Sequence, residues 1–166
     1  MNPAERKSLL DSYGSAHSRL IKTLKPLPEA VWQYEPGSGE WSIHEVLLHL
    51  TDSEANLYVR ARRIIAEPGS KVLAFDHDLW AKRLSYQKQN AEASLELFKY
   101  LRQLTYDLLK DLPENIWQNT VEHSQFGIMT LDQWLERADK HANDHIKQIQ
   151  DNFNAWSRRT STVKKA

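Results

Sequence analysis

The sequence predicts an all-α protein, a four-helix bundle with a long crossover between its second and third helices. Apolar residues recur at helical spacing in four long stretches, and no stretch alternates as a strand would. Only 5 glycines and 6 prolines occur among 166 residues, which favours long regular elements over many turns. We expect one domain over residues 1–156, followed by a basic, disordered tail at 157–166.

The first two helices are placed by their start and stop signals. Asn2 before Pro3 is a capping residue followed by a first-turn proline, and the first helix should end near Lys25. The second helix should begin at SIHE, residues 42–45, which is a capping box, and end at EPGS, residues 67–70.

The last two helices follow the same logic. The third should run from about Asn90 to Asp111, and the fourth should open with the capping box TLDQ at 130–133. The residues of the third helix expected to face inward are Leu95, Phe98, Leu101, Leu104 and Leu108.

The connections repeat a motif. LPEAVWQ at 27–33 returns as LPENIWQ at 112–118, and each copy stands between a helix and a capping box. Two helix–loop–helix units, joined by residues 66–89, would have to pack together to bury their apolar faces. The joining stretch should hold a short helix capped by Asp76, and residues 117–127 a short extended piece at most.

Composition excludes several classes of function. The chain has no cysteine, so disulfides, thiolate metal sites and a cysteine nucleophile are ruled out. The net charge is 0, but the last ten residues hold four basic groups and no acid, which leaves −4 on the rest. That sign argues against nucleic acid as a partner. The sequence shows neither a signal peptide nor an apolar run of the ~18 residues that a membrane span needs, so we expect a cytoplasmic protein.

Two histidines lie on the inward stripe of the fourth helix. His141 and His145 are four residues apart, which puts both rings on one face and lets two nitrogens converge on one ion. The alternative is a pair of hydrogen-bonded core histidines, each of which would need its own buried partner. The segment HANDH has Ala142 where a metalloprotease of the HExxH type has glutamate, so that chemistry is not expected.

The second helix offers the third ligand. His44 and His49 are five residues apart, so their rings should point about 140° apart and cannot share an ion. His49 lies beside Val46 and Leu50 on the inward side and is the better candidate. His44 stands at the helix start and is expected to be solvated.

Three further residues and one loop are candidates for the surroundings of such a site. Asp52 could act as a base for water or substrate. Trp80 and the loop at 70–85 could form a wall of the pocket, and His123, expected in a loop, could approach its mouth and contact a cofactor or substrate. His17 is expected to be a hydrogen-bonded core histidine.

Three segments together resemble the DinB/YfiT-type metalloprotein superfamily, and the resemblance runs from about Trp32 to Phe153. They are EWSIHEVLLHLTDSE, AFDHDLW and EHSQFGIMTLDQWLERADKHANDHIKQI. The most specific part is one histidine on the second helix together with an HxxxH pair on the fourth, preceded by a G-x-x-T-L helix start. Here these are His49, His141, His145 and residues 127–131.

The resemblance implies a four-helix bundle that holds a divalent metal (Zn, Ni or Fe) on three histidines with open positions. Members of the superfamily include enzymes that transfer low-molecular-weight thiols such as bacillithiol and enzymes that isomerise substrates with mycothiol. Others were labelled metal-dependent hydrolases or were first noted as DNA-damage-inducible, and many form dimers. By this resemblance a small-molecule substrate and a homodimer are expected.

Three hypotheses for the function remain open at this stage. The first is a metal-dependent enzyme that activates a thiol or water, because a chain without cysteine must take its nucleophile from outside. The second is a non-enzymatic metal-binding or stress-response protein with a structural or sensory site, which a fourth ligand such as His17 or His123 would favour. The third is a bundle without metal. If histidines bind the ion, its affinity should fall as the pH drops through roughly 6–7.

Overall fold

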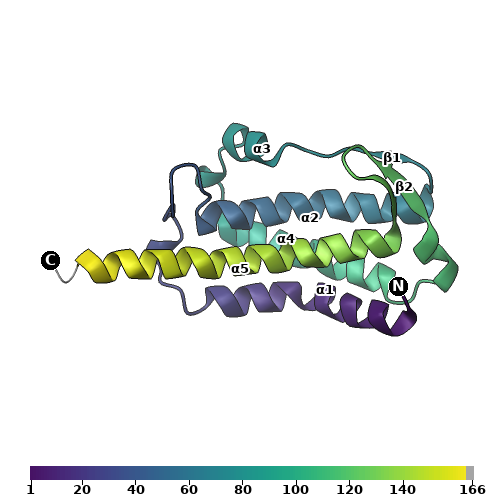
Figure 1. The fold of residues 1–166 in the computed structure, drawn as a ribbon, viewed down its shortest axis with the longest axis horizontal. Helices are drawn as coiled ribbons and strands as arrows, with labels where there is room; N and C mark the ends of the chain where they lie inside the picture. The colour runs from purple at the N-terminus through teal and green to yellow at the C-terminus, as the bar shows by residue number, and fades with distance from the viewer. Residues whose placement is uncertain (164–166) are drawn as a thin grey trace.

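Four long helices lie side by side in the computed structural model, which describes residues 1–163 (Figure 1). The first and last run in one direction along the bundle and the middle two run in the other, so the chain must return along the bundle between the middle two. The predicted four-helix bundle with a crossover is thereby confirmed. These helices are α1 (Pro3–Leu24), α2 (Ile43–Ala66), α4 (Ala91–Leu109) and α5 (Leu131–Val163).

The crossover and the segment before α5 are more regular than the sequence indicated. The crossover contains β1 (Lys71–Val72) and the short helix α3 (His77–Arg83). A hairpin of β2 (Thr120–His123) and β3 (Gly127–Thr130) replaces the single extended piece expected at 117–127. β1 pairs in parallel with β2, so a small sheet of order β1-β2-β3 covers one end of the bundle (Figure 1).

Local capping explains where the helices begin. The Asn2 and Ser42 side chains each close a complete capping box, and Asp76 caps α3 by accepting from the backbone N–H of Leu79 at 2.9 Å. At the start of α5, Thr130 and Gln133 exchange reciprocal side-chain to backbone bonds of 3.0 and 3.2 Å. Each of these starts was predicted, because capping depends on residues three positions apart and not on the rest of the fold.

The inward face of α4 differs from the prediction. Leu104 and Leu108 are 52% and 36% exposed, whereas Arg102 and Thr105 are buried in their place. The helix is rotated relative to the predicted stripe because Arg102 reaches into the core to meet Glu54 of α2. A cation thus occupies a position that hydrophobic patterning assigns to leucine.

The Arg102–Glu54 pair joins all four long helices. The Arg102 Nε donates to Glu54 Oε2 at 2.7 Å, and its Nη2 donates to the carbonyl of Ala138 on α5 at 3.1 Å. Tyr13 of α1 donates its hydroxyl to Glu54 Oε1 at 2.5 Å, and burial raises the pKa of that phenol well above its ordinary value. Arg102 and Glu54 are each 1% exposed, so both charges rely entirely on these partners.

Helix α5 is longer than predicted. It continues to Val163, so residues 157–163 of the expected disordered tail are helical, while residues 164–166 lie outside the described part of the chain. Thr160 bonds back to the carbonyl of Trp156 at 3.1 Å, and Arg159 stands 5.9 Å from the ring centroid of Tyr34. Side chains beyond the predicted boundary thus contact α5 itself and the loop that precedes α2. Within residues 1–163, no helix has an apolar stretch of the length required to cross a membrane.

Candidate metal centre

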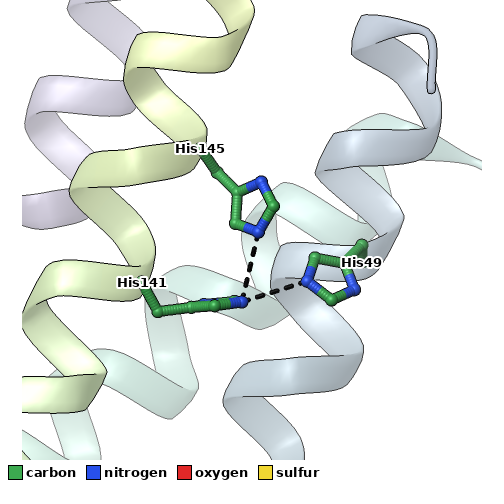
Figure 2. A group of neighbouring side chains, drawn as sticks. All are labelled: His49, His141 and His145. Carbon is green, nitrogen blue, oxygen red and sulfur yellow. Dashed lines mark hydrogen bonds between the residues drawn. The ribbon is translucent and has the colours of Figure 1, made fainter. Parts of the chain in front are cut away.

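Three histidine rings meet between α2 and α5 (Figure 2). His49 comes from α2, whereas His141 and His145 come from successive turns of α5. The Nε2 of His141 lies 3.0 Å from that of His49 and 3.2 Å from that of His145. Each ring offers one nitrogen, and these nitrogens all lie within 4.8 Å of one another. The structure therefore brings together the three residues that the sequence singled out as ligands.

The spacing of these nitrogens fits a single small cation. In a tetrahedral zinc site the metal–nitrogen distance is about 2.0–2.1 Å, which puts neighbouring ligand nitrogens about 3.3–3.4 Å apart. The two short separations, 3.0 and 3.2 Å, are within a few tenths of that edge. The third pair, His49 and His145, lies within 4.8 Å, so side-chain rotations that bring these two rings closer would let one ion touch all three nitrogens.

Neighbouring groups orient two of the rings. The carboxamide oxygen of Gln148 lies 2.7 Å from His145 Nδ1, and because it can only accept, Nδ1 carries the proton and Nε2 keeps its lone pair for a metal. The Trp41 ring packs against His49 with centroids 4.7 Å apart, and Ser53 Oγ lies 3.3 Å from His49 Nε2. Among the described residues, Nδ1 of His49 has no hydrogen-bond partner although it is buried.

Burial keeps the histidine cluster neutral. Burial first, and then repulsion from neighbouring charged groups, lower the pKa of His49 to about 2 and that of His141 to about 3. The pKa of His145 is also lowered, again chiefly by burial. Neutral imidazoles are the form that binds metals, so all three lone pairs are available at physiological pH.

The cluster lies on the wall of a large cavity. The cavity has a volume of about 980 Å³ and is lined by residues of α2, α5, the crossover and the hairpin. Trp41, Phe75 and His77 stand near His49, with the His77 ring centroid 5.7 Å from that of His49. The three rings thus border a space that can admit a small molecule, and they are not sealed inside the core.

Asp52 does not belong to this cavity. It is absent from the lining residues, and its Oδ2 accepts a hydrogen bond of 2.5 Å from the hydroxyl of Tyr86. Burial first, and then this bond, raise the pKa of Tyr86. The predicted role of Asp52 as a base beside the ligands therefore has no structural support, because its carboxylate does not line the cavity and already accepts the bond from Tyr86.

The structure supports only some of the other predicted neighbours of the site. Trp80 is not a wall residue: it packs on Phe75 at a centroid distance of 4.6 Å, and Phe75 lines the cavity instead. His123 does line the cavity, but from strand β2 and at 2% exposure, not from an exposed loop. His44 is buried as well, at 8% exposure, with Nε2 3.1 Å from the carbonyl of Tyr86, so the prediction that it is solvated was wrong.

Several cavity residues were missed by the sequence reasoning. Arg60 and Arg137 both line the cavity, as does Phe126 at the hairpin turn. Arg137 precedes His141 by four residues, and that spacing alone could have placed it one turn from the ligands. Nothing local could have placed Phe126, because its position depends on the sheet.

The low pKa values predict how the stability of the metal-free protein depends on pH. A histidine whose pKa is near 6.5 when unfolded and about 2 or 3 when folded stabilises the fold above pH 6.5, and the contribution is lost as the pH falls. Between pH 7 and pH 5 we expect His49 and His141 to cost about 2 kcal/mol each in the free energy of unfolding. Urea unfolding of chelator-treated protein measures this loss.

The control is His77→Gln, a change at an exposed residue, which should leave that pH dependence intact. His141→Gln should remove about 2 kcal/mol of it, the contribution of that ring. A free energy of unfolding that is flat between pH 5 and 7 would contradict the neutral cluster. The fall of metal affinity through pH 6–7 stays a prediction. The low pKa values of His49 and His141 indicate that protons compete only weakly for these two rings in that range, so the fall should be smaller than free imidazoles would give.

Comparison with known proteins identifies relatives of the chain. A relative from Oceanobacillus iheyensis, named "putative metal-dependent hydrolase", is 29% identical over 112 residues, which cover 68% of this chain and 64% of that protein. A relative of the same name from Halalkalibacterium halodurans is 28% identical over 112 residues, covering 68% and 65%. The chain thus spans slightly less than two thirds of the length of these relatives.

A solved structure and a family profile extend the comparison. YfiT from Bacillus subtilis, described as "a probable metal-dependent hydrolase with an unusual four-helix bundle topology", superimposes with a TM-score of 0.86 over 97% of this chain and 90% of that one. At 20% sequence identity this likeness concerns the fold alone. Residues 13–149 match the profile of the DinB superfamily. Because that match covers most of the chain, the protein belongs to the DinB superfamily.

Proposed function

We propose that the chain is a metal-dependent enzyme that activates water or a low-molecular-weight thiol, as a hydrolase or a thiol S-transferase does. His49, His141 and His145 would hold the divalent ion, zinc, nickel or iron. The observation that carries this proposal is the convergence of three neutral imidazoles at the wall of a cavity of about 980 Å³. A cavity of that volume is typical of a site for a small organic molecule.

The donor set suits this chemistry. A divalent ion, when bound, supplies positive charge that lowers the pKa of a coordinated water or thiol toward neutrality. Three neutral histidines leave that charge undiminished, and they leave room for an exogenous ligand on the cavity side. Gln148 and Trp41 would keep the rings in place, and the hydroxyl of Ser53 stands next to His49 as a nearby donor or acceptor.

The arrangement favours the enzymatic reading over a structural or sensory site. A closed structural site would be expected to have a fourth protein ligand. Within residues 1–163, the group that can converge on one ion contains three residues, and neither His17 nor His123 belongs to it. The names of the relatives support hydrolysis, and the choice between water and a thiol as nucleophile is left to experiment.

Metal content and activity test the proposal together. Protein purified without a nickel column should contain or take up about one zinc, nickel or iron ion per chain, and the loaded protein should hydrolyse model esters or transfer a small thiol to an electrophile such as monobromobimane. His145→Ala should lower that activity by more than about 100-fold, because loss of a partner behind a ligand already costs 10–100-fold.

The matched control is His17→Gln, which changes a histidine of α1 outside the cavity and should preserve activity. Less than about 0.2 metal ion per chain after loading would contradict histidine ligation. Activity that survives in His145→Ala would contradict the enzymatic assignment even if the metal binds.

A further inference from the structure

The cavity is electrically asymmetric along the bundle. Arg137 lies one turn before His141 on α5, and Arg60 lies in the C-terminal half of α2. Because α2 and α5 are antiparallel, both arginines fall on the side of the histidines that faces the small sheet (Figure 1). Acidic lining residues such as Asp144 and Asp151 lie on α5 beyond His141, in the other direction.

The two arginines lack acidic partners. Arg60 donates through Nη2 to the carbonyl of Leu73 at 2.6 Å, and Arg137 stands 4.0 Å from the ring centroid of Phe126. Neither forms an ion pair with any carboxylate in the described part of the chain. Burial lowers the pKa of Arg60, which shows that the side chain has lost hydration without gaining a counter-charge.

His123 adds an unused donor at the same end. Its Nδ1 accepts from the backbone N–H of Gln125 at 3.1 Å, so the proton of the neutral ring is on Nε2. That Nε2 is buried and has no hydrogen-bond partner among the described residues, although His123 lines the cavity. Burial, followed by the charges of Arg60 and Arg137, lowers the pKa of His123, so both guanidinium groups act on this ring and keep it neutral.

We propose that Arg60, Arg137 and His123 bind an anionic group, a carboxylate or a phosphate ester, at the far end of the substrate or thiol whose reacting end reaches the histidine cluster. This inference rests on the proposed function. Two planar guanidinium groups and one N–H donor are the groups that recognise such anions. Phe126 at the hairpin turn contacts two of these groups: its ring stacks on His123 at a centroid distance of 4.7 Å and lies 4.0 Å from the guanidinium of Arg137.

The helices set the length of ligand that would fit. At 1.5 Å per residue, Arg137 is about 6 Å along α5 from His141, and Arg60 is about 16 Å along α2 from His49. A molecule with an anion at one end and a reactive group at the other, separated by several carbon atoms, would span this range. Ligands with a charged group directly beside the reacting atom would not.

A matched set of ligands tests the proposal on metal-free protein. The probes are mercaptohexanoate, its neutral amide and hexyl phosphate, and the readout is NMR titration of the His123 ring and the hairpin amides. We expect the carboxylate to bind at least about tenfold more tightly than the amide, as one charge-assisted contact would give. Tighter binding of hexyl phosphate than of the carboxylate would assign the site to phosphate esters, and the reverse order to carboxylates.

Arginine variants show which side chains cause the preference for the carboxylate over the amide. The double variant Arg60→Gln/Arg137→Gln should bind the carboxylate and the amide with nearly equal affinity. If the double variant does not fold, Arg137→Gln alone, a change at an exposed residue, serves instead and should lower the ratio of the two affinities. Arg63→Gln is the matched control: Arg63 also lies on α2 and binds a crossover carbonyl, that of Lys71 at 3.0 Å, but it does not line the cavity. The carboxylate-to-amide affinity ratio of this control should equal that of the wild type.

The results separate this inference from the proposed function. Three results would overturn the anion site, whatever the metal content. They are equal affinity of the wild type for carboxylate and amide, an unchanged affinity ratio in the Arg60 and Arg137 variants, and an equal loss of that ratio in Arg63→Gln. A tenfold ratio in a protein that takes up no metal would support the anion site while refuting the metal-dependent enzyme.

Discussion

Replacing His141 with alanine should weaken metal binding by more than about 100-fold, the largest effect we expect of a single substitution at this site. The reason is geometric: Nε2 of His141 is the nitrogen that lies close to both others, at 3.0 Å from His49 and 3.2 Å from His145. Without it, two nitrogens from different helices remain, and within residues 1–163 no other residue belongs to the group that can converge on one ion. Competition with a chromophoric chelator measures the change in affinity.

In the same variant, added metal should no longer stabilise the folded protein. A ligand that binds only the folded state stabilises it by about 4 kcal/mol at a concentration 1,000 times its dissociation constant. We therefore expect zinc to raise the melting temperature of the wild type and to leave that of His141→Ala nearly unchanged. His17→Gln, the control outside the cavity, should respond as the wild type does. Wild-type affinity in His141→Ala would show that the ion binds elsewhere.

Replacing Glu54 with glutamine should cost about 3–5 kcal/mol of stability, because it leaves the charge of Arg102 buried without a counter-charge. Both side chains are 1% exposed, and water cannot compensate for the lost partner. Tyr13 and Ala138 would still contact the pair from α1 and α5, but neither carries a charge. Urea unfolding monitored by circular dichroism measures the loss.

Two comparisons sharpen this prediction. Glu114→Gln also breaks a bond to an arginine, Arg6, but Glu114 is 67% exposed, so we expect a cost below about 1 kcal/mol. Replacing Glu54 and Arg102 together by leucine and methionine should recover most of the stability, since an apolar pair of similar volume removes both desolvation costs. If Glu54→Gln costs no more than Glu114→Gln, the pair does not hold the helices as described.

The features that the sequence predicted correctly are those set by local rules. Helix starts at Ser42 and Thr130 follow from residues three positions apart, and the shared face of His141 and His145 follows from the helical repeat. His49 could be chosen over His44 because five residues turn a helix by about 140°. Each of these inferences needs only the geometry of one helix.

The features that were missed depend on partners distant in the sequence. Arg102 faces the core because Glu54, 48 residues earlier, accepts its hydrogen bond, and a hydrophobic pattern cannot show this. Asp52 turns to the hydroxyl of Tyr86, 34 residues later. His123 is buried because β2 pairs with β1 from the crossover, which also fixes the basic end of the cavity.

Anomalous diffraction at the zinc absorption edge, from crystals of the zinc-loaded protein, tests the central claim most directly. We predict a single strong peak between α2 and α5, about 2.0–2.1 Å from Nε2 of each of His49, His141 and His145. A protein that crystallises with zinc bound at another position, or with none between these three rings, would contradict it.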